Sequence, residues 1–248
     1  MHTPAALVTG GATRLGRHFA EALAEKGYDI ALHVNSSRGE AEEVAKVIRQ
    51  KGQACEILPC NFLSDTLEAL VTAAKQHFPG LNVLLNSASA YQPAPIASTD
   101  MVMLETQFRV NLFTPLLLTR HFAEAVENGQ VINIIDNKVA YHQYPYAAYL
   151  LSKKSLADMT RMAALEFSPR LRVNGIAPGV VLPASQRTSD YIQWRIEGIP
   201  LKQQGDPTHL VQALYYLLDN RFVTGQVLFV DGGESSNLEG RHSENYAV

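Results

Sequence analysis

The amino-acid sequence predicts an α/β fold, in which a doubly wound parallel sheet of about seven strands lies between two layers of helices. Short runs of β-branched and other apolar residues alternate with longer stretches of helical periodicity along the 248-residue chain. Glycine and proline residues fall between the two kinds of segment, where helices end. Strict alternation of strands and helices is typical of a parallel sheet with helices on both faces. We therefore expect a three-layer, single-domain protein.

Seven short segments have the composition of buried strands. They are rich in valine, isoleucine, leucine and alanine and carry few charges. Nearly continuous apolar runs of this kind are typical of parallel strands, because helices cover both of their faces. The expected strands are Ala5–Thr9, Asp29–Val34, Ala54–Pro59, Asn82–Asn86, Val131–Asp136, Arg172–Ala177 and Val227–Val230.

Six longer segments between the strands have apolar residues at helical spacing. Gly27, Gly52 and Pro169 lie just past the ends of three of these segments, where helix termination favours such residues. The expected helices are about Leu15–Lys26, Gly39–Lys51, Ser64–His77, Asp100–Val126, Ala147–Phe167 and Pro207–Leu218.

Two segments do not follow the alternation. Pro178–Pro200 lacks clean periodicity and is long for a connection, so we interpret it as a binding loop or lid, in which Tyr191 and Trp194 either close over a ligand or serve as packing residues. The polar tail 235–248 is expected to fray or to pack on a neighbouring subunit. Within one domain over residues 1–248, we expect a nucleotide-binding half at about 1–90 and a catalytic half at about 91–234.

Composition excludes several classes of partner. The net charge is −3 and the basic residues are scattered, so we expect neither nucleic acid nor an anionic membrane as a partner. No apolar run is long enough to span a bilayer, and Met1–Pro4 lack the features of a signal peptide, which predicts a cytoplasmic protein. Cys55 and Cys60 are interpreted as buried free thiols rather than a disulfide or metal pair, and no metal site is expected.

The first expected strand leads through the sequence Thr-Gly-Gly-Ala-Thr-Arg-Leu-Gly (Thr9–Gly16) directly into a helix. Glycines allow the backbone to approach a pyrophosphate, and the helix N-terminus offers free N–H groups and the positive end of its dipole. A glycine-rich turn alone is often only a tight turn. At the first crossover of a doubly wound sheet, it favours a dinucleotide site.

The end of the second strand selects the cofactor. Enzymes that use NAD place a carboxylate there to accept hydrogen bonds from the ribose 2′-hydroxyl. This chain has no acidic residue from His33 until Glu40, and Arg38 and Arg14 are available instead. Hydroxyls and guanidinium groups suit a 2′-phosphate, so we expect NADP(H). The alternative for Arg38 is a helix cap in solvent.

Tyr149 and Lys153 lie four residues apart on one face of an expected helix. A tyrosine is protonated at neutral pH and can give a proton to a substrate, and a nearby cation stabilises the phenolate that remains. The pair alone is unspecific, because both residues are common on exposed helices. It becomes a specific signal when the dinucleotide turn precedes it and the sequence Asn-Gly-Ile-Ala-Pro-Gly (Asn174–Gly179) follows it.

These features together resemble the short-chain dehydrogenase/reductase family, which has a Rossmann-type fold, over nearly the whole chain. Asn86–Ser89, Asn111 and Asp231–Gly233 also match. The resemblance implies that Tyr149 is the proton donor, that Lys153 binds the nicotinamide ribose and lowers the pKa of the tyrosine, and that Asn111 orders a proton-relay water. The expected cofactor contacts are Gly10, Arg14, Leu15, Gly16, His33, Asn35, Ser36, Ser37, Arg38, Asn61, Phe62, Ser87, Ala88, Lys153, Pro178, Gly179 and Val180.

Two residues depart from the common pattern of that family. Arg14 replaces the central glycine of the turn, and Asp136 replaces a serine. A serine hydroxyl donates to a ketone oxygen as the oxygen gains charge, whereas a carboxylate opposes an oxyanion and suits a substrate with N–H donors or a protonated C=N bond. The alternative for Asp136 is a degraded site or a turn cap.

Both departures resemble the pteridine reductase branch of the family, which includes bacterial dihydromonapterin and dihydrofolate reductases. The resemblance implies that the catalytic residues are Asp136, Tyr149 and Lys153, with Asn111, and that Tyr91 is a stacking wall for the pterin, although a phenylalanine or tryptophan is usual there. Asn61-Phe62 also stands where the family often has an aspartate. The expected substrate contacts are Arg14, Ser89, Tyr91, Asp136 and Tyr149.

The sequence therefore predicts an NADPH-dependent enzyme that reduces a dihydropterin to its tetrahydro form. The alternatives are a reductase of ketones or 3-oxoacyl thioesters, against which Asp136 argues, and a non-catalytic protein that binds NADP(H). Because Ala147–Phe167 carries apolar residues on more than one face, and because family members assemble through the two long middle helices, we expect a homotetramer or a homodimer.

Overall fold

A computed structural model describes residues 2–182, 188–237, 241 and 246. All seven strands belong to one parallel sheet with the order β3-β2-β1-β4-β5-β6-β7. The strands are β1 (Ala5–Thr9), β2 (Asp29–Val34), β3 (Cys55–Pro59), β4 (Leu81–Asn86), β5 (Gly129–Ile134), β6 (Leu171–Pro178) and β7 (Val227–Val230). The predicted seven-stranded, doubly wound sheet is confirmed, and the strand order reverses between β1 and β4.

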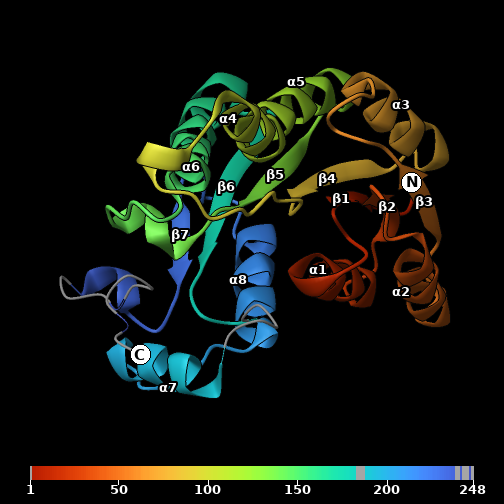
Figure 1. Cartoon of the computed structure of the whole chain (residues 1–248). Coiled ribbons are helices and arrows are strands. Elements are labelled where there is room, and N and C mark those ends of the chain that lie inside the picture. Colours follow the sequence, from red (N-terminus) through yellow and green to blue (C-terminus); the bar gives the residue numbers. More distant parts are fainter. Residues whose placement is uncertain (1, 183–187, 238–240, 242–245, 247–248) are drawn as a thin grey trace.

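Helices cover both faces of the sheet (Figure 1). One face packs against α1 (Arg14–Glu25), α2 (Arg38–Gln50) and α8 (Pro207–Asp219), whose buried residues form one apolar core with the sheet. The other face packs against α3 (Leu67–His77), α5 (Thr114–Ala125) and α6 (Ala147–Phe167), which form the second core. The helix α4 (Met101–Phe108) lies against α6. Both cores are needed because every central strand is apolar on its two faces.

The expected helix Asp100–Val126 is interrupted in the structure. Asp100 caps α4 by accepting a hydrogen bond from the backbone N–H of Met103, but a π-helical turn, η2 (Arg109–Phe113), separates α4 from α5. The turn contains Asn111, which is completely buried. Single π turns inside longer helices often occur at functional sites. The apolar periodicity of the sequence continues through this turn and does not indicate it.

The expected loop Pro178–Pro200 contains a helix, which corrects its interpretation as an irregular segment. Thr188 caps α7 (Ser189–Gly198) by accepting from the backbone N–H of Tyr191. Residues 183–187 of the expected loop lie outside the described part of the chain. The helix stands away from the sheet at the carboxyl ends of its strands (Figure 1).

Part of the C-terminal tail packs on α7. Arg241 donates to the carbonyl of Trp194 at 2.7 Å and pairs with Glu197 at 2.9 Å, and the ring of Tyr246 contacts the rings of Tyr191 and Trp194. The other tail residues beyond 237, for which fraying was an expectation, lie outside the described part of the chain. The two described positions pack on their own chain.

The outer face of α6 exposes large apolar side chains. Met162 is 68% and Leu165 is 83% exposed, and Phe113 and Leu116 are also exposed where α5 begins. Among the described residues, no helix is long and apolar enough to cross a membrane. Cys55 and Cys60 are buried free thiols, and burial raises their pKa values to about 12 and about 11.

Candidate active site

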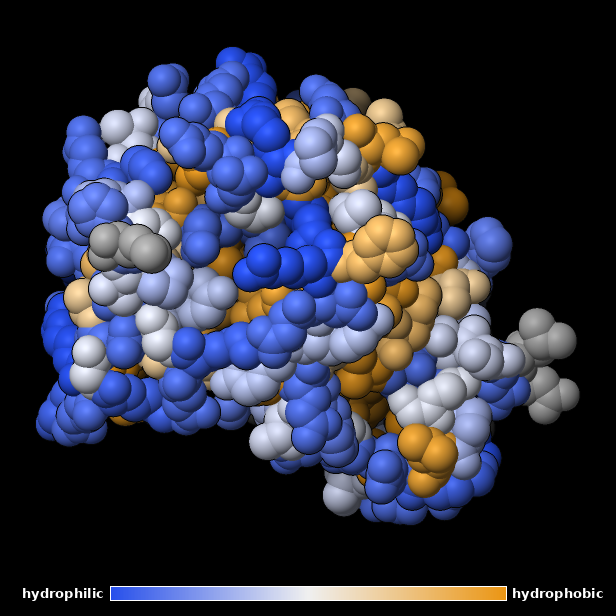
Figure 2. Space-filling model, turned by 180° about the vertical axis from the view of Figure 1, so that it is seen from behind, coloured by the Kyte–Doolittle hydropathy of each residue, from blue (hydrophilic) through white to orange (hydrophobic). Residues whose placement is uncertain are grey.

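One large cavity lies at the carboxyl ends of the central strands. Its volume is about 750 Å³, in the upper part of the roughly 300–1,000 Å³ range of ligand sites. Its walls extend from the glycine turn after β1 to Tyr149 and Lys153 on α6. Figure 2 shows the molecule from behind, where hydrophobic residues are visible in a hollow between the body and the lobe at the lower right. The cavity occupies the position at which doubly wound sheets bind their ligands.

In the turn after β1, the backbone at Gly10 and Gly16 packs unusually close to neighbouring backbone atoms. Gly10 has a φ of +62°, and a Cβ atom there would lie 2.9 Å from the Cα of Ala88. A Cβ atom at Gly16 would lie 2.1 Å from the carbonyl oxygen of Gly10. Side chains are therefore excluded, which leaves the N-terminus of α1 open toward the cavity. The arrangement fits the pyrophosphate of a dinucleotide, as the sequence predicts.

Thr9 and His33 hold this turn in place. The hydroxyl of Thr9 accepts from the backbone N–H groups of Ser87 and Ala88, which joins the ends of β1 and β4. Nδ1 of His33 accepts from the N–H of Gly10 at 3.0 Å, so its Nε2 carries the proton and donates to the carbonyl of Cys60. Burial lowers the pKa of His33 to about 4, and the ring is therefore neutral.

The predicted cofactor residues differ in whether they line the cavity and in which contacts they already make. Of the seventeen, only Arg38 does not line the cavity among the described residues; it is exposed at the start of α2. His33 reaches the cavity with its ring stacked on Phe62 at 4.2 Å, and both of its nitrogens are engaged. The side-chain Oδ1 of Asn61 accepts locally from the N–H of Leu63. Arg14 adopts a positive φ of 49° and donates to the carbonyl of Leu182.

At the opposite end of the cavity, Tyr149 and Asp136 form a direct contact. The phenol of Tyr149, in the first turn of α6, donates to Oδ2 of Asp136 at 2.7 Å. Asp136 does not end a strand as expected: β5 stops at Ile134, and Asp136 caps the turn η3 (Asn137–Ala140), where its Oδ1 accepts from the N–H of Lys138 at 2.8 Å. Because each carboxylate oxygen has two lone pairs, Asp136 can still accept from a ligand.

The pKa values of the pair differ from the expectation. Burial and then the carboxylate of Asp136 raise the pKa of Tyr149 well above its ordinary value. The family resemblance implies a lowering by Lys153, which is not among the groups that shift this pKa, and its role toward Tyr149 stays a prediction. Burial lowers the pKa of Lys153 to about 8, and its Nζ donates to the carbonyl of Ile134 at 2.8 Å. Tyr149 is therefore a phenol, not a phenolate, at neutral pH.

The side chain of Asn111 is not brought to the phenol. Its Oδ1 accepts from the N–H of Ala90 at 2.9 Å and from the hydroxyl of Ser89 at 3.1 Å, and its Nδ2 donates to the carbonyl of Ala90 and the hydroxyl of Ser152. With these contacts the side chain supports the loop after β4, and its role in ordering a proton-relay water stays a prediction. The π turn η2 places it there.

The loop supported by Asn111 carries the expected substrate contacts. Ser89 and Tyr91 both line the cavity. The ring of Tyr91 lies edge-on to Tyr149 with 4.8 Å between ring centroids, and it stacks on Tyr146 at the same distance. It is 55% exposed, so it presents apolar surface next to the phenol. Tyr91, which the resemblance assigns to a stacking wall, therefore lies at this end of the cavity.

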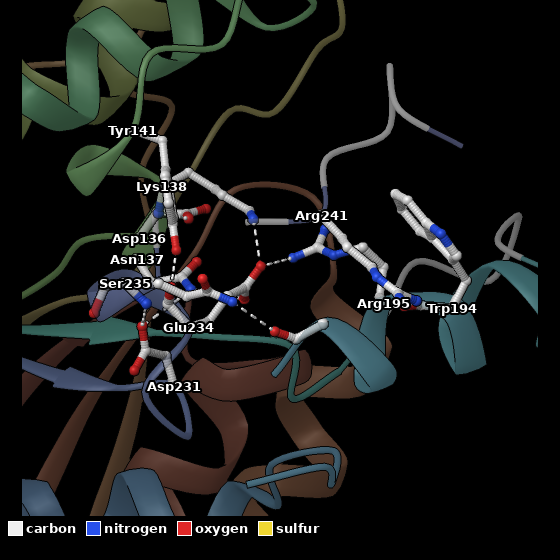
Figure 3. A network of polar contacts seen from close by, with 12 residues as sticks. Asp136, Asn137, Lys138, Tyr141, Trp194, Arg195, Asp231, Glu234, Ser235 and Arg241 are labelled. Carbon is white, nitrogen blue, oxygen red and sulfur yellow. Dashed lines mark hydrogen bonds and ion pairs between the residues drawn. The ribbon is translucent and has the colours of Figure 1, made fainter. Parts of the chain in front are cut away.

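Sequence reasoning missed a buried polar network next to Asp136 (Figure 3). Oε1 of Glu234, a residue that is 1% exposed, contacts Lys138 Nζ and the guanidinium of Arg195, each at 2.6 Å. Lys138 and Arg195 also line the cavity, together with Tyr191 from the same helix as Arg195. Ninety-six residues separate Lys138 from Glu234, and no local pattern connects them; only the position of Lys138, two residues after Asp136, was a signal.

Of the two aromatics predicted to lie over a ligand, Tyr191 lines the cavity and is buried. Trp194 points toward the tail, where Arg241 lies over its ring. Among the residues that the structure describes, no group of histidine, cysteine, aspartate or glutamate side chains is arranged to hold a metal ion.

Three comparisons with known proteins agree with this geometry. Pteridine reductase 1 of Leishmania tarentolae is 29% identical, and the alignment covers 94% of this chain and 96% of that protein. A 3-oxoacyl-(acyl-carrier-protein) reductase of Staphylococcus epidermidis is 26% identical, with 92% and 97% covered. The crystal structure of FolM alternative dihydrofolate reductase 1 from Brucella suis, in complex with NADP, is 31% identical with a TM-score of 0.90 and covers 98% of both chains.

A family model described as enoyl-(acyl carrier protein) reductase matches residues 10–235, which is most of the chain. The match begins in the glycine turn and includes Tyr149, Lys153 and the segment that ends with Glu234. The chain therefore belongs to the short-chain dehydrogenase/reductase family of oxidoreductases.

Proposed function

We propose that the chain is an NADPH-dependent reductase that converts a dihydropterin, such as dihydromonapterin or dihydrofolate, to its tetrahydro form. The observation that supports the proposal most directly is the 2.7 Å contact between the phenol of Tyr149 and the carboxylate of Asp136 on the wall of the cavity. A phenol with a raised pKa next to a carboxylate is a poor partner for an oxyanion. It is a good partner for a basic ring nitrogen.

Each residue of the site has a separate role in such a reduction. Tyr91 offers an aromatic face to a flat heterocycle, and Asp136 accepts hydrogen bonds from its N–H groups. When bound, the nicotinamide supplies a hydride to one ring carbon of the substrate. Tyr149 gives its proton to the adjacent nitrogen of the C=N bond. A protonated C=N bond is a cation, and the negative charge of Asp136 stabilises it.

Lys153 is proposed to bind the nicotinamide ribose as a cation, which predicts a limit at alkaline pH. Because burial lowers its pKa to about 8, Lys153 carries its charge below that pH and loses it above. We expect kcat/KM to fall as the pH rises through about 8. Tyr149 stays protonated over this interval because its own pKa is raised.

The pH profile of Lys153→Arg tests this assignment, since a guanidinium keeps its charge throughout. The alkaline decline should disappear or move to higher pH in that variant. Lys154→Arg, at the partly exposed neighbouring position, is the matched control and should keep the wild-type profile. An unchanged decline in Lys153→Arg would assign the limit to another group.

The phosphorylated cofactor is supported by the environment of the second strand. Asn35, Ser36 and Ser37 line the cavity there without a carboxylate, and Arg14 lines it from the glycine turn. The Brucella suis relative was crystallised with NADP. We expect Arg14→Ala combined with Arg38→Ala to raise the KM for NADPH about 10–150-fold, with a smaller rise for NADH, because a charged hydrogen bond contributes about 1.5–3 kcal/mol.

Initial rates with both cofactors check this prediction. The single variants Arg14→Ala and Arg38→Ala show which arginine binds the 2′-phosphate. Of these two arginines, Arg14 lines the cavity and Arg38 does not. A uniform increase for NADPH and NADH would mean that neither does. In that case the contact of Arg14 with Leu182 would be its main role.

Oxidation of NADPH in the presence of different substrates tests the proposed function. Dihydromonapterin and dihydrofolate should be reduced faster than an acetoacetyl thioester. The thioester is the appropriate competitor because the Staphylococcus epidermidis relative is a 3-oxoacyl reductase. Faster turnover of the thioester would exclude the pterin assignment, and cofactor binding without turnover of any substrate would support a non-catalytic NADP(H)-binding protein.

We also propose that the protein assembles as a homotetramer or homodimer through α5 and α6. The exposed apolar residues Met162 and Leu165 on α6, and Leu116 on α5, support this surface. Large exposed apolar side chains gathered on neighbouring helices are more often found at an interface than on a free surface.

A further inference from the structure

Glu234 is a buried carboxylate behind one wall of the active site. Its residue is 1% exposed, and it begins the short turn η4 (Glu234–Ser236) after β7. Oε1 contacts Lys138 Nζ and the guanidinium of Arg195, each at 2.6 Å, and Oε2 accepts from Nδ2 of Asn137 at 2.9 Å (Figure 3). Lys138 and Arg195 line the cavity, whereas Glu234 does not. The carboxylate therefore influences a ligand through these two cations.

The contacts of Glu234 hold the segment that follows Asp136. Besides the side chains of Asn137 and Lys138, the phenol of Tyr141 binds to this residue by donating to its backbone carbonyl. The backbone N–H of Lys138 donates in turn to Oδ1 of Asp136 at 2.8 Å. Two cations and the carboxylate of Asp136 therefore share one wall of the cavity, and Glu234 supports that wall from behind.

Glu234 and its two cations support one another's charged forms. Burial tends to raise the pKa of Glu234, but Arg195 and Lys138 hold it below its ordinary value, so the carboxylate is charged. Burial tends to lower the pKa of Arg195, but Glu234 raises it above its ordinary value. Burial and then Arg195 lower the pKa of Lys138, whereas Glu234 and Asp136 oppose that lowering. Glu234 is thus the anion that compensates these two cations at their closest contacts.

The sign of the charge at this wall affects the two candidate reactions in opposite ways. A protonated C=N bond is a cation, which Asp136 stabilises and which uncompensated cations would oppose. A carbonyl oxygen gains negative charge during reduction, and the same cations would stabilise it. Charges several ångströms apart in a protein still interact strongly enough to change a rate constant about tenfold. Compensation of Lys138 and Arg195 therefore favours the first reaction over the second.

We propose that Glu234 is a positioning residue that sets the substrate preference of the site. It holds Lys138 and Arg195 and compensates their positive charge, which keeps the negative charge of Asp136 effective toward a ring nitrogen. The inference rests on the proposed function and adds to it a specificity-determining residue that does not line the cavity. A purely structural role is different, because it does not depend on the sign of the charge that is removed.

Variants that remove charges of opposite sign test this role. The measurement is the ratio of kcat/KM for dihydromonapterin to that for an acetoacetyl thioester, at pH 6, where a lysine favours its charged form. Glu234→Gln keeps the size and removes the negative charge, and the ratio should fall about tenfold. Lys138→Met removes a cation but keeps the backbone N–H that caps Asp136, and the ratio should rise. The double variant restores the wild-type sum of charges, so its ratio should return close to that of the wild type.

Glu197→Gln is the matched control, because it makes the same chemical change in an exposed ion pair of α7 with Arg241, and it should keep the wild-type ratio. Thermal unfolding shows whether each variant is folded. If Glu234→Gln does not fold, Lys138→Met alone decides, and an unchanged or lower ratio in it overturns the inference. Parallel losses for both substrates in Glu234→Gln, without recovery in the double variant, would leave Glu234 with only a structural role. An unchanged ratio in folded Glu234→Gln also overturns the inference.

The failure of this inference is distinguishable from the failure of the proposed function. The direction in which the ratio changes does not depend on which substrate the wild type prefers. Faster turnover of the thioester by the wild type would refute the proposed function, and a ratio that still falls in Glu234→Gln would keep Glu234 as the residue that sets the preference. A wild type that prefers the pterin, with the same ratio in all variants, would refute the role of Glu234 alone.

Discussion

Replacing Tyr149 with phenylalanine is expected to reduce the turnover of a dihydropterin by about 10²–10⁴-fold, the usual contribution of a general acid. The phenol is the group that faces the cavity and that also donates to Asp136 at 2.7 Å. Because burial and Asp136 raise its pKa above the ordinary value, it holds its proton at neutral pH. Phenylalanine preserves the ring that packs edge-on against Tyr91 and removes the hydroxyl, with its proton and its hydrogen bond to Asp136.

Stopped-flow measurement of a single turnover, together with a titration of NADPH binding, checks this expectation. The affinity for NADPH should change little, so the loss should lie in the chemical step. Tyr216→Phe, a change of the same size on the half-exposed face of α8, is the control and should retain wild-type turnover. Wild-type turnover in Tyr149→Phe would mean that water or another side chain donates the proton, and it would leave the contact with Asp136 without a catalytic role.

The sheet was predictable because its signals are local. Each strand is an apolar run bounded by turn residues, and the predicted and observed bounds differ by at most two residues, as at β5, where Gly129–Ile134 replaces Val131–Asp136. The π turn at Asn111 was not predictable, since its cause is a set of tertiary contacts with Ala90 and Ser152. The apolar periodicity of the sequence passes through it unchanged.

The same distinction applies to the site. The family resemblance paired Asp136 with Tyr149. The fold brings them together because Asp136 follows a central strand, Tyr149 lies in the first turn of the next helix, and both reach the same edge of the sheet. The network around Glu234 joins η3, α7 and the segment after β7, which only the folded chain brings together. The helix α7 was missed for a related reason: its hydrophobic and charged contacts are made with the tail and with Glu234, so its own sequence shows weak periodicity.

Replacing Asp136 with serine is expected to lower kcat/KM for a dihydropterin by about 10–150-fold, as for a lost hydrogen bond to a charged group. The carboxylate is the acceptor that the site offers to the N–H groups of a heterocycle, and a serine hydroxyl offers a weaker one without negative charge. The phenol should become a stronger acid in this variant, because the carboxylate is one of the causes of its raised pKa. Both changes favour a carbonyl substrate, whose oxygen gains negative charge during reduction.

The measurement is the ratio of kcat/KM for a dihydropterin to that for an acetoacetyl thioester, in the wild type, Asp136→Ser and Asp136→Asn. Asparagine keeps the shape and the cap on the N–H of Lys138 but removes the charge, so it separates charge from geometry. If charge decides the substrate, asparagine should lose pterin turnover nearly as much as serine does, and both variants, each of which offers a donor in place of the charge, should gain turnover of the thioester. Equal pterin turnover in all three proteins would show that the carboxylate does not select the substrate, and the chain would then keep only its assignment as a reductase of its family.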